Sequence, residues 1–213
     1  MTIREFGPPS APYVLIEPIG DYDPDGIEGD YNKIRQRTDA EFRLITIAVD
    51  SWNCDLSPWK APAVFGKEDF GDGAEELLKA VLSLCEDRSK TYIIGGYSLA
   101  GLFALWAATR TDVFRGVAAA SPSAWFPGLT EYLREHGMPC GTVVSLSLGD
   151  REARTRNPVM STVDTRIREI RDILQEQGAD VTLTWNPGNH FAEPDIRTAK
   201  AYAEVLQRLA EQP

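Results

Sequence analysis

The chain has 213 residues, of which 43% are hydrophobic, and this composition is sufficient for the core of one domain spanning residues 1–213. Its formal net charge of −10 excludes nucleic acid and anionic membrane as expected partners, because those surfaces are bound through clustered Lys and Arg. The three cysteines lack zinc-type or redox spacing, and no stretch approaches the roughly 18 apolar residues of a membrane span.

The chain starts without the apolar core of a signal peptide. We therefore expect a cytoplasmic protein with reduced thiols, no bound metal and no cofactor. The sequence leaves open whether the chain forms a homo-oligomer.

Apolar, β-branched runs alternate along the chain with segments of helical periodicity. The runs predict strands at 13–18, 42–50, 91–96, 115–120, 142–148 and 181–186. Helical spacing predicts helices around 27–34, after 72, after 98, at 161–177 and at 193–210. This alternation is typical of a three-layer α/β/α sandwich with a mainly parallel sheet of about six strands.

Two of these strands alternate between apolar and polar residues, those at 143–148 and 181–185. Alternation indicates that one face is less thoroughly covered, so we expect both strands toward one side of the sheet.

A long segment, residues 51–71, is rich in Pro, Trp and Asp and predicts no regular structure. Loops of this length in compact domains usually form a wall or lid of a site. The segment contains Trp52 and Trp59, and Trp125 follows the strand predicted at 115–120. We expect these three indoles to line a substrate pocket.

Ser98 lies between a strand-like run and a helix-like run, in the pattern G-x-S-x-A. A nucleophilic serine of this kind occupies a strained turn from strand to helix, where only small residues fit two positions before and after it. Gly96 and Ala100 occupy those positions. The pattern predicts that Ser98 is a nucleophile, although a five-residue pattern of this kind also occurs by chance in unrelated sequences.

The chain offers two histidines as a base for Ser98. His136 comes just before Gly137 at a predicted helix end, where a cationic side chain complements the helix dipole, so it has a structural explanation. His190 instead follows the last predicted strand. Serine, acid and histidine in this chain order are typical of an α/β-hydrolase, and we expect His190 to be the base.

Two carboxylates follow the strand at 142–148 and could orient His190. Glu152 lies three residues after Gly149, so the intervening loop is long enough to turn back toward the histidine. Asp150 directly follows the strand end and could instead fix the loop. We favour Glu152 and keep Asp150 as the alternative.

An oxyanion hole requires two backbone N–H donors. The amide of Leu99, the residue after the nucleophile, is the first candidate. The second is expected in the loop after the strand at 13–18, from Gly20 or its neighbour Asp21.

The residues around Ser98 also resemble a known family. The run GYSLAGLFAL at 96–105, followed by AAASPSAW at 118–125, is similar to the esterase D and enterochelin-esterase-like group of the α/β-hydrolase superfamily. The likeness extends from about residue 92 to residue 190. It implies a Ser-His-acid carboxylesterase in which Ser98 and His190 match the nucleophile and the base.

The chain departs from this family in three respects. It is too short at its start for the two leading strands of a full sheet, it lacks a His-Gly-Gly motif, and it lacks the extra N-terminal domain of the siderophore esterases. Siderophore hydrolysis therefore does not carry over. Because the acid position varies within the group, the choice between Glu152 and Asp150 stays open.

The leading hypothesis is a serine esterase that cleaves small or medium esters. One alternative is a binding module that retains the hydrolase fold without catalysis. Another is an acyltransferase that uses the same three residues.

Overall fold

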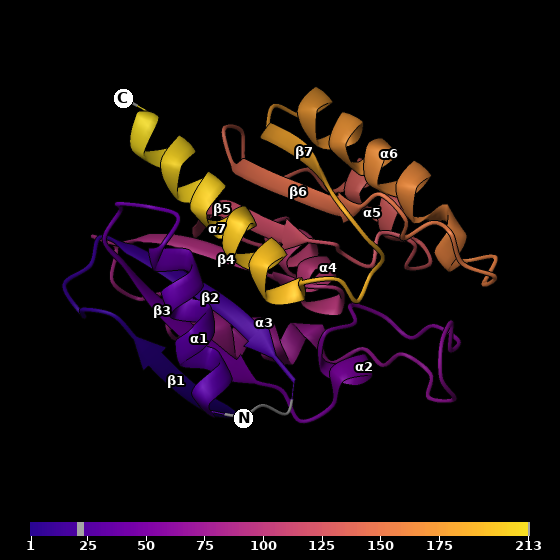
Figure 1. Cartoon of the computed structure of the whole chain (residues 1–213), viewed down its shortest axis with the longest axis horizontal. Helices are drawn as coiled ribbons and strands as arrows, with labels where there is room; N and C mark the ends of the chain where they lie inside the picture. Colours follow the sequence, from indigo (N-terminus) through magenta and orange to yellow (C-terminus); the bar gives the residue numbers. More distant parts are fainter. Residues whose placement is uncertain (21–23, 213) are drawn as a thin grey trace.

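A computed structural model describes residues 1–20 and 24–212, without the side chains of residues 24–27, and within them seven strands form one sheet (Figure 1). The sheet order is β1-β3-β2-β4-β5-β6-β7. The strands are β1 (Thr2–Phe6), β2 (Tyr13–Ile19), β3 (Phe42–Ala48), β4 (Thr91–Tyr97), β5 (Phe114–Ala120), β6 (Val143–Gly149) and β7 (Asp180–Asn186). Every pair of neighbours is parallel except β1 and β3.

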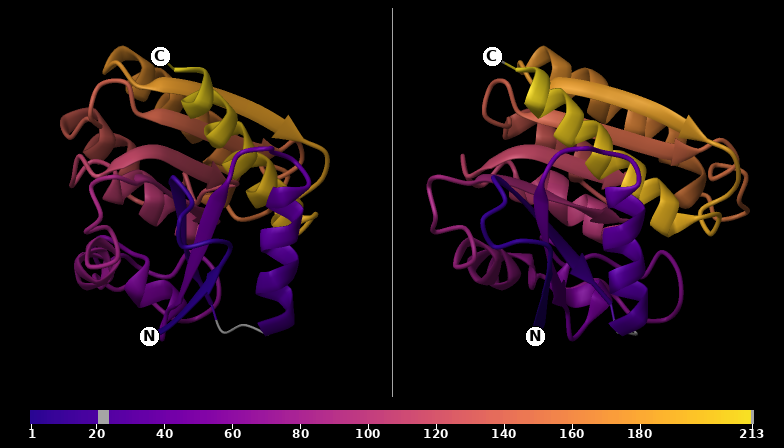
Figure 2. Two further views of the ribbon diagram at one scale, coloured as in Figure 1. Left: turned by 90° about the vertical axis from the view of Figure 1, so that its left-hand side faces the viewer. Right: turned by 60° about the vertical axis from the view of Figure 1, so that its left-hand side comes forward.

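Helices cover both faces of the sheet (Figure 2). They are α1 (Pro24–Arg35), α2 (Trp52–Asp55), α3 (Ala74–Leu82), α4 (Leu99–Ala107), α5 (Leu129–Glu135), α6 (Val163–Glu176) and α7 (Pro194–Glu211). One core cluster joins the sheet to α3, α4, α5 and α6, and a second joins it to α1 and α7. The predicted three-layer α/β fold is therefore confirmed.

All six predicted strands are present, but the sheet has one more strand than expected. β1 pairs antiparallel with β3, from Thr2 opposite Ala48 to Phe6 opposite Leu44. Most of β1 is exposed, so its sequence TIREF carries no buried apolar run that could mark it as a strand. Its place depends on pairing with β3.

The structure refines the expectations for the two alternating strands and for the segment 51–71. β6 and β7 lie next to each other at one side of the sheet, as predicted, but β6 is buried along its whole length, because α7 covers the face that carries its serines. Ser145 on that face donates a hydrogen bond to Glu204 of α7, with the oxygens 2.6 Å apart. The segment 51–71 is not wholly irregular, since it contains α2 and a short antiparallel bridge between Ala61 and Phe70.

The carboxyl ends of the parallel strands meet at one edge of the sheet, where loops after β2, β4, β6 and β7 come together. Open parallel sheets place their ligand sites at this edge. In the part of the chain that is described, none of the helices has both the length and the apolar character needed to cross a membrane.

Candidate active site

Ser98 occupies a strained turn between β4 and α4. Its backbone has φ 57° and ψ −118°, a conformation that a residue with a side chain rarely adopts. Gly96 has φ 154°, and a Cβ added to it would lie 2.6 Å from the Cβ of Ala100. The small residues on either side of Ser98 are therefore a steric requirement of this turn, as the sequence pattern predicted.

Ser98, His190 and Glu152 form a continuous hydrogen-bonded chain. Ser98 Oγ lies 3.1 Å from His190 Nε2, and His190 Nδ1 lies 2.8 Å from Glu152 Oε2. With Glu152 ionised, Nδ1 carries the proton and donates a hydrogen bond to the carboxylate, which leaves Nε2 free to accept a hydrogen bond from the Ser98 hydroxyl. The three groups have the arrangement of a nucleophile, a base and an orienting acid.

The second oxygen of Glu152 is fully engaged. Oε1 accepts hydrogen bonds from Ser121 Oγ at 2.7 Å, the Gly149 N–H at 2.7 Å and Arg197 Nη1 at 2.8 Å. Burial alone raises the pKa of Glu152, but the hydrogen bonds from His190, Ser121 and Gly149 outweigh it and lower the pKa below its usual value. Glu152 is therefore an anion at neutral pH, as an orienting acid requires.

Asp150, the alternative acid, faces away from this chain of contacts. Its side chain is 58% exposed, and its Oδ1 accepts a hydrogen bond from the Gly188 N–H at 2.8 Å. Asp150 thus ties the loop after β6 to the loop that carries His190. Of the two carboxylates proposed from sequence, only Glu152 contacts the histidine.

Sequence analysis missed Arg197, which lies in the first turn of α7 and is only 2% exposed. Its Nη1 donates to Glu152, to Ser121 Oγ at 3.1 Å and to the Tyr97 hydroxyl at 3.2 Å. Its Nη2 donates to the carbonyls of Pro187 and Asn189, at 2.9 and 3.0 Å.

One guanidinium thus holds both the acid and the loop that carries the base. The available sequence signal was a cation in the first turn of a helix, a position that the helix dipole disfavours.

Backbone N–H groups are available near Ser98. The Leu99 N–H is the first of α4, where the helix leaves its initial amides without internal acceptors. β2 and β4 pair in parallel as far as Ile16 opposite Ile94, so the loop after β2, which begins at Gly20, lies at the same edge of the sheet as Ser98. Asp21, the other residue considered for the second donor, lies outside the described residues.

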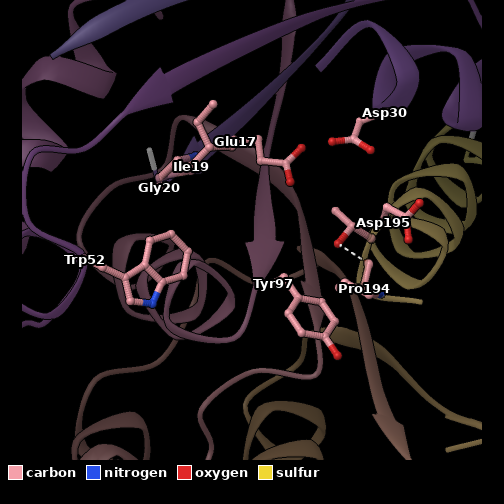
Figure 3. A pocket seen from close by; sticks show the side chains of 10 residues that line it. Glu17, Ile19, Gly20, Asp30, Trp52, Tyr97, Pro194 and Asp195 are labelled. Atoms are coloured by element: carbon pink, nitrogen blue, oxygen red, sulfur yellow. Dashed lines mark hydrogen bonds between the residues drawn. The ribbon is translucent and has the colours of Figure 1, made fainter. Parts of the chain in front are cut away.

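The three predicted pocket tryptophans have different surroundings. Trp52 lines a cavity of about 170 Å³ together with Gly20 and Tyr97 (Figure 3). Trp59 instead donates its indole N–H to the Pro127 carbonyl at 2.8 Å.

Trp59 packs between the rings of Phe126 and Tyr132. Trp125 is 7% exposed and lies against Phe65 and Phe70. Trp59 and Trp125 thus pack against other aromatic side chains, and their expected place in a substrate pocket stays a prediction.

No protein-family model and no curated protein sequence matches this chain. Solved structures do match it. An IroE-like serine hydrolase from Shewanella oneidensis has a TM-score of 0.73 and 16% identity, with 99% of this chain and 77% of that chain covered. The siderophore hydrolase EstA from Aspergillus nidulans has a TM-score of 0.62 and 20% identity, with 94% and 82% covered.

The enterobactin esterase FES from Shigella flexneri has a TM-score of 0.63 and 17% identity over 97% of this chain and 55% of its own. These likenesses confirm the α/β-hydrolase fold and the resemblance in fold to the enterochelin-esterase-like group.

Proposed function

We propose that this chain is a serine esterase that hydrolyses small or medium carboxylic esters. The observation that carries the proposal is the hydrogen-bonded chain from Ser98 through His190 to Glu152, with the serine held at a strained turn. The likeness in fold to a serine hydrolase and to esterases supports the same chemistry. The loops that carry the three groups follow β4, β6 and β7 of one sheet, so we place the whole activity in one domain.

In the proposed reaction, Ser98 Oγ attacks the ester carbonyl carbon while its proton passes to His190 Nε2. Glu152 stabilises the resulting imidazolium, and the N–H groups of Leu99 and Gly20 bind the oxyanion. Removal of one such donor in comparable sites costs roughly 10²–10³ in rate. The intermediate then expels the alcohol, which takes the proton from His190.

The acyl group now remains on Ser98 as an ester. Water attacks this acyl-enzyme and gives a proton to His190, and collapse of the second intermediate returns that proton to Ser98 Oγ. The products are a carboxylic acid and an alcohol, and the three side chains regain their starting protonation states.

Covalent labelling tests the proposal. A fluorophosphonate should add one phosphonyl group to the wild-type protein, detected by intact mass, and Ser98→Ala should abolish both the label and turnover of p-nitrophenyl butyrate. Ser123→Ala is the matched control, because its Oγ lies 3.4 Å from Ser98 Oγ without contacting His190. Undiminished labelling of Ser98→Ala would move the nucleophile elsewhere, and a folded wild-type protein that neither labels nor turns over esters would favour a binding module.

A further inference from the structure

The cavity walled by Tyr97, the residue before Ser98, is lined by three carboxylates that the proposed reaction does not use (Figure 3). Glu17 projects from β2, Asp30 from α1 and Asp195 from the first turn of α7. Trp52 and Tyr97 form aromatic walls of the same cavity. We call this cavity, with Glu17, Asp30 and Asp195, the acidic pocket.

An ammonium group of the protein already lies at one side of the acidic pocket. Lys33 Nζ is 3.1 Å from Asp30 Oδ1 and 2.7 Å from Asp195 Oδ2. These ion pairs compensate part of the charge of Asp30 and Asp195. They do not extend to Glu17.

Glu17 is the unusual member of the acidic pocket. It is only 8% exposed, and within residues 1–20 and 28–212 no hydrogen-bond donor or cation pairs with its carboxyl group. Buried polar groups are nearly always paired, because an unpaired one keeps its full desolvation cost. A carboxyl group that is left unpaired and lines a cavity indicates that a ligand supplies the missing partner.

The geometry favours an organic cation over a metal ion. Among the described residues, no three acidic, His or Cys side chains converge closely enough to hold a metal. The cavity of about 170 Å³ is close to the roughly 150 Å³ that accommodates benzene in an engineered protein, so it fits a short alkyl chain with a charged end. The rings of Trp52 and Tyr97 suit such a group, because aromatic faces attract cations.

The acidic pocket adjoins the candidate active site. Tyr97, which forms one wall, is the residue before Ser98, and Gly20, which forms another, is the proposed second oxyanion donor. Tyr97 also contacts His190, because its hydroxyl donates to the His190 carbonyl at 2.6 Å and the two ring centroids are 5.1 Å apart. We propose that the acidic pocket binds the ammonium group of the substrate, so that the preferred ester carries a protonated primary amine; this inference rests on the proposed esterase function.

The protonation state of Glu17 should make ammonium binding in the acidic pocket depend on pH. Burial, and then the charge of Asp30, raise the pKa of Glu17 to about 8. Among the described residues, the other titratable groups around it are Lys33 of α1, Asp195 and Tyr202 of α7, and Tyr97 of β4. An ammonium group binds the ionised carboxylate best, so preference for the amine should rise as the pH increases from 6 to 9, where an alkylamine is still mostly protonated.

The kinetic test compares p-nitrophenyl esters of ω-amino acids of several chain lengths with isosteres in which a methyl group replaces the ammonium. The readout is the ratio of the two kcat/KM values, because this ratio cancels effects on Ser98 and His190. We expect a ratio of at least about tenfold at pH 8.5 for the best chain length, the size of one charge-assisted hydrogen bond.

Glu17→Gln should reduce this ratio toward one and remove its pH dependence. Glu135→Gln is the matched control, because it removes one exposed glutamate on α5, and it should leave the ratio unchanged. A ratio near one at every chain length, or a ratio unaffected by Glu17→Gln in a folded protein, would overturn the inference.

A binding experiment separates this inference from the esterase proposal. Ser98→Ala protein is titrated with n-butylammonium or with n-butanol and followed by NMR. If no ester is hydrolysed by the wild-type protein, saturable binding of n-butylammonium alone, lost in the Ser98→Ala, Glu17→Gln double variant, would support the acidic pocket while the esterase proposal fails. In that case, absence of saturable binding would overturn the pocket as well.

Discussion

Arg197 and Glu152 form a buried ion pair at the centre of the candidate site, with Nη1 2.8 Å from Oε1 and side chains only 2% and 3% exposed. The same guanidinium holds two carbonyls of the loop before His190. The pair thus couples the position of Glu152 to the position of the loop that carries His190.

Removing Arg197 should therefore affect both stability and catalysis. Arg197→Met leaves the Glu152 charge buried without its cation, so the free energy of unfolding should fall by about 3–5 kcal/mol. Arg197→Lys should retain more stability but still lower kcat, because an ammonium cannot reproduce the planar fork that reaches Pro187 and Asn189. Urea denaturation and ester hydrolysis measure the two effects.

Arg115→Met is the control for Arg197→Met, because Arg115 is exposed on β5 and its loss should change the free energy of unfolding by less than about 0.5 kcal/mol. If Arg197→Met unfolds at the same urea concentration as the wild-type protein, the ion pair does not have the structural role assigned to it.

The two carboxylates after β6 should respond differently to amide substitution. Glu152→Gln should lower kcat by about 10²–10⁴, because the side chain loses the charge that fixes the His190 tautomer and stabilises the imidazolium. Asp150→Asn, which alters the hydrogen bond from the Gly188 N–H and an exposed ion pair with Arg151, should lower kcat by less than about tenfold. Steady-state kinetics on both variants would reassign the acid if the order of the losses were reversed.

The turn at Ser98 should tolerate a side chain at residue 96 only if the side chain at residue 100 is removed. Gly96→Ala should lower the free energy of unfolding by about 1–3 kcal/mol, because the new Cβ lies at a positive φ and 2.6 Å from the Ala100 Cβ. Ala100→Gly in the same chain should recover part of that loss. A double-mutant cycle by urea denaturation measures the coupling, and strictly additive effects would contradict the steric explanation.

Buried Glu17 should make the stability of the protein depend on pH. Its pKa is about 8 in the folded protein, whereas the ordinary pKa of 4.5 applies to the unfolded chain. Between pH 4.5 and pH 8 the unfolded chain therefore loses a proton that the folded chain retains. Its contribution to stability is therefore complete below pH 4.5, declines as the pH rises through this window and levels off above pH 8.

The full decline should be about 4–5 kcal/mol, at about 1.4 kcal/mol per pKa unit. Urea denaturation between pH 5 and pH 9 measures it. Glu17→Gln should flatten the decline, whereas Glu135→Gln should preserve it. Parallel curves for the wild-type protein and Glu17→Gln would show that Glu17 is ionised at neutral pH in the folded chain.

Most elements of the fold were predictable because their signals are local. Buried parallel strands such as β4 and β5 have continuous apolar runs, and α6 has an apolar stripe at helical spacing. β1 was not predictable in this way, since its exposed residues carry no such pattern and its conformation depends on contact with β3.

The sequence by itself determined the strained turn at Ser98, because the steric demands on Gly96 and Ala100 act over a few bonds. Only the tertiary structure placed Glu152 rather than Asp150 against His190, brought Arg197 to Glu152 and left Glu17 without a partner among the described residues. Those outcomes depend on which side chains meet across the loops after β2, β6 and β7, where partners such as Glu152 and His190 are 38 positions apart. Contacts of that range are set by how the helices pack on the sheet, which no local pattern of residues records.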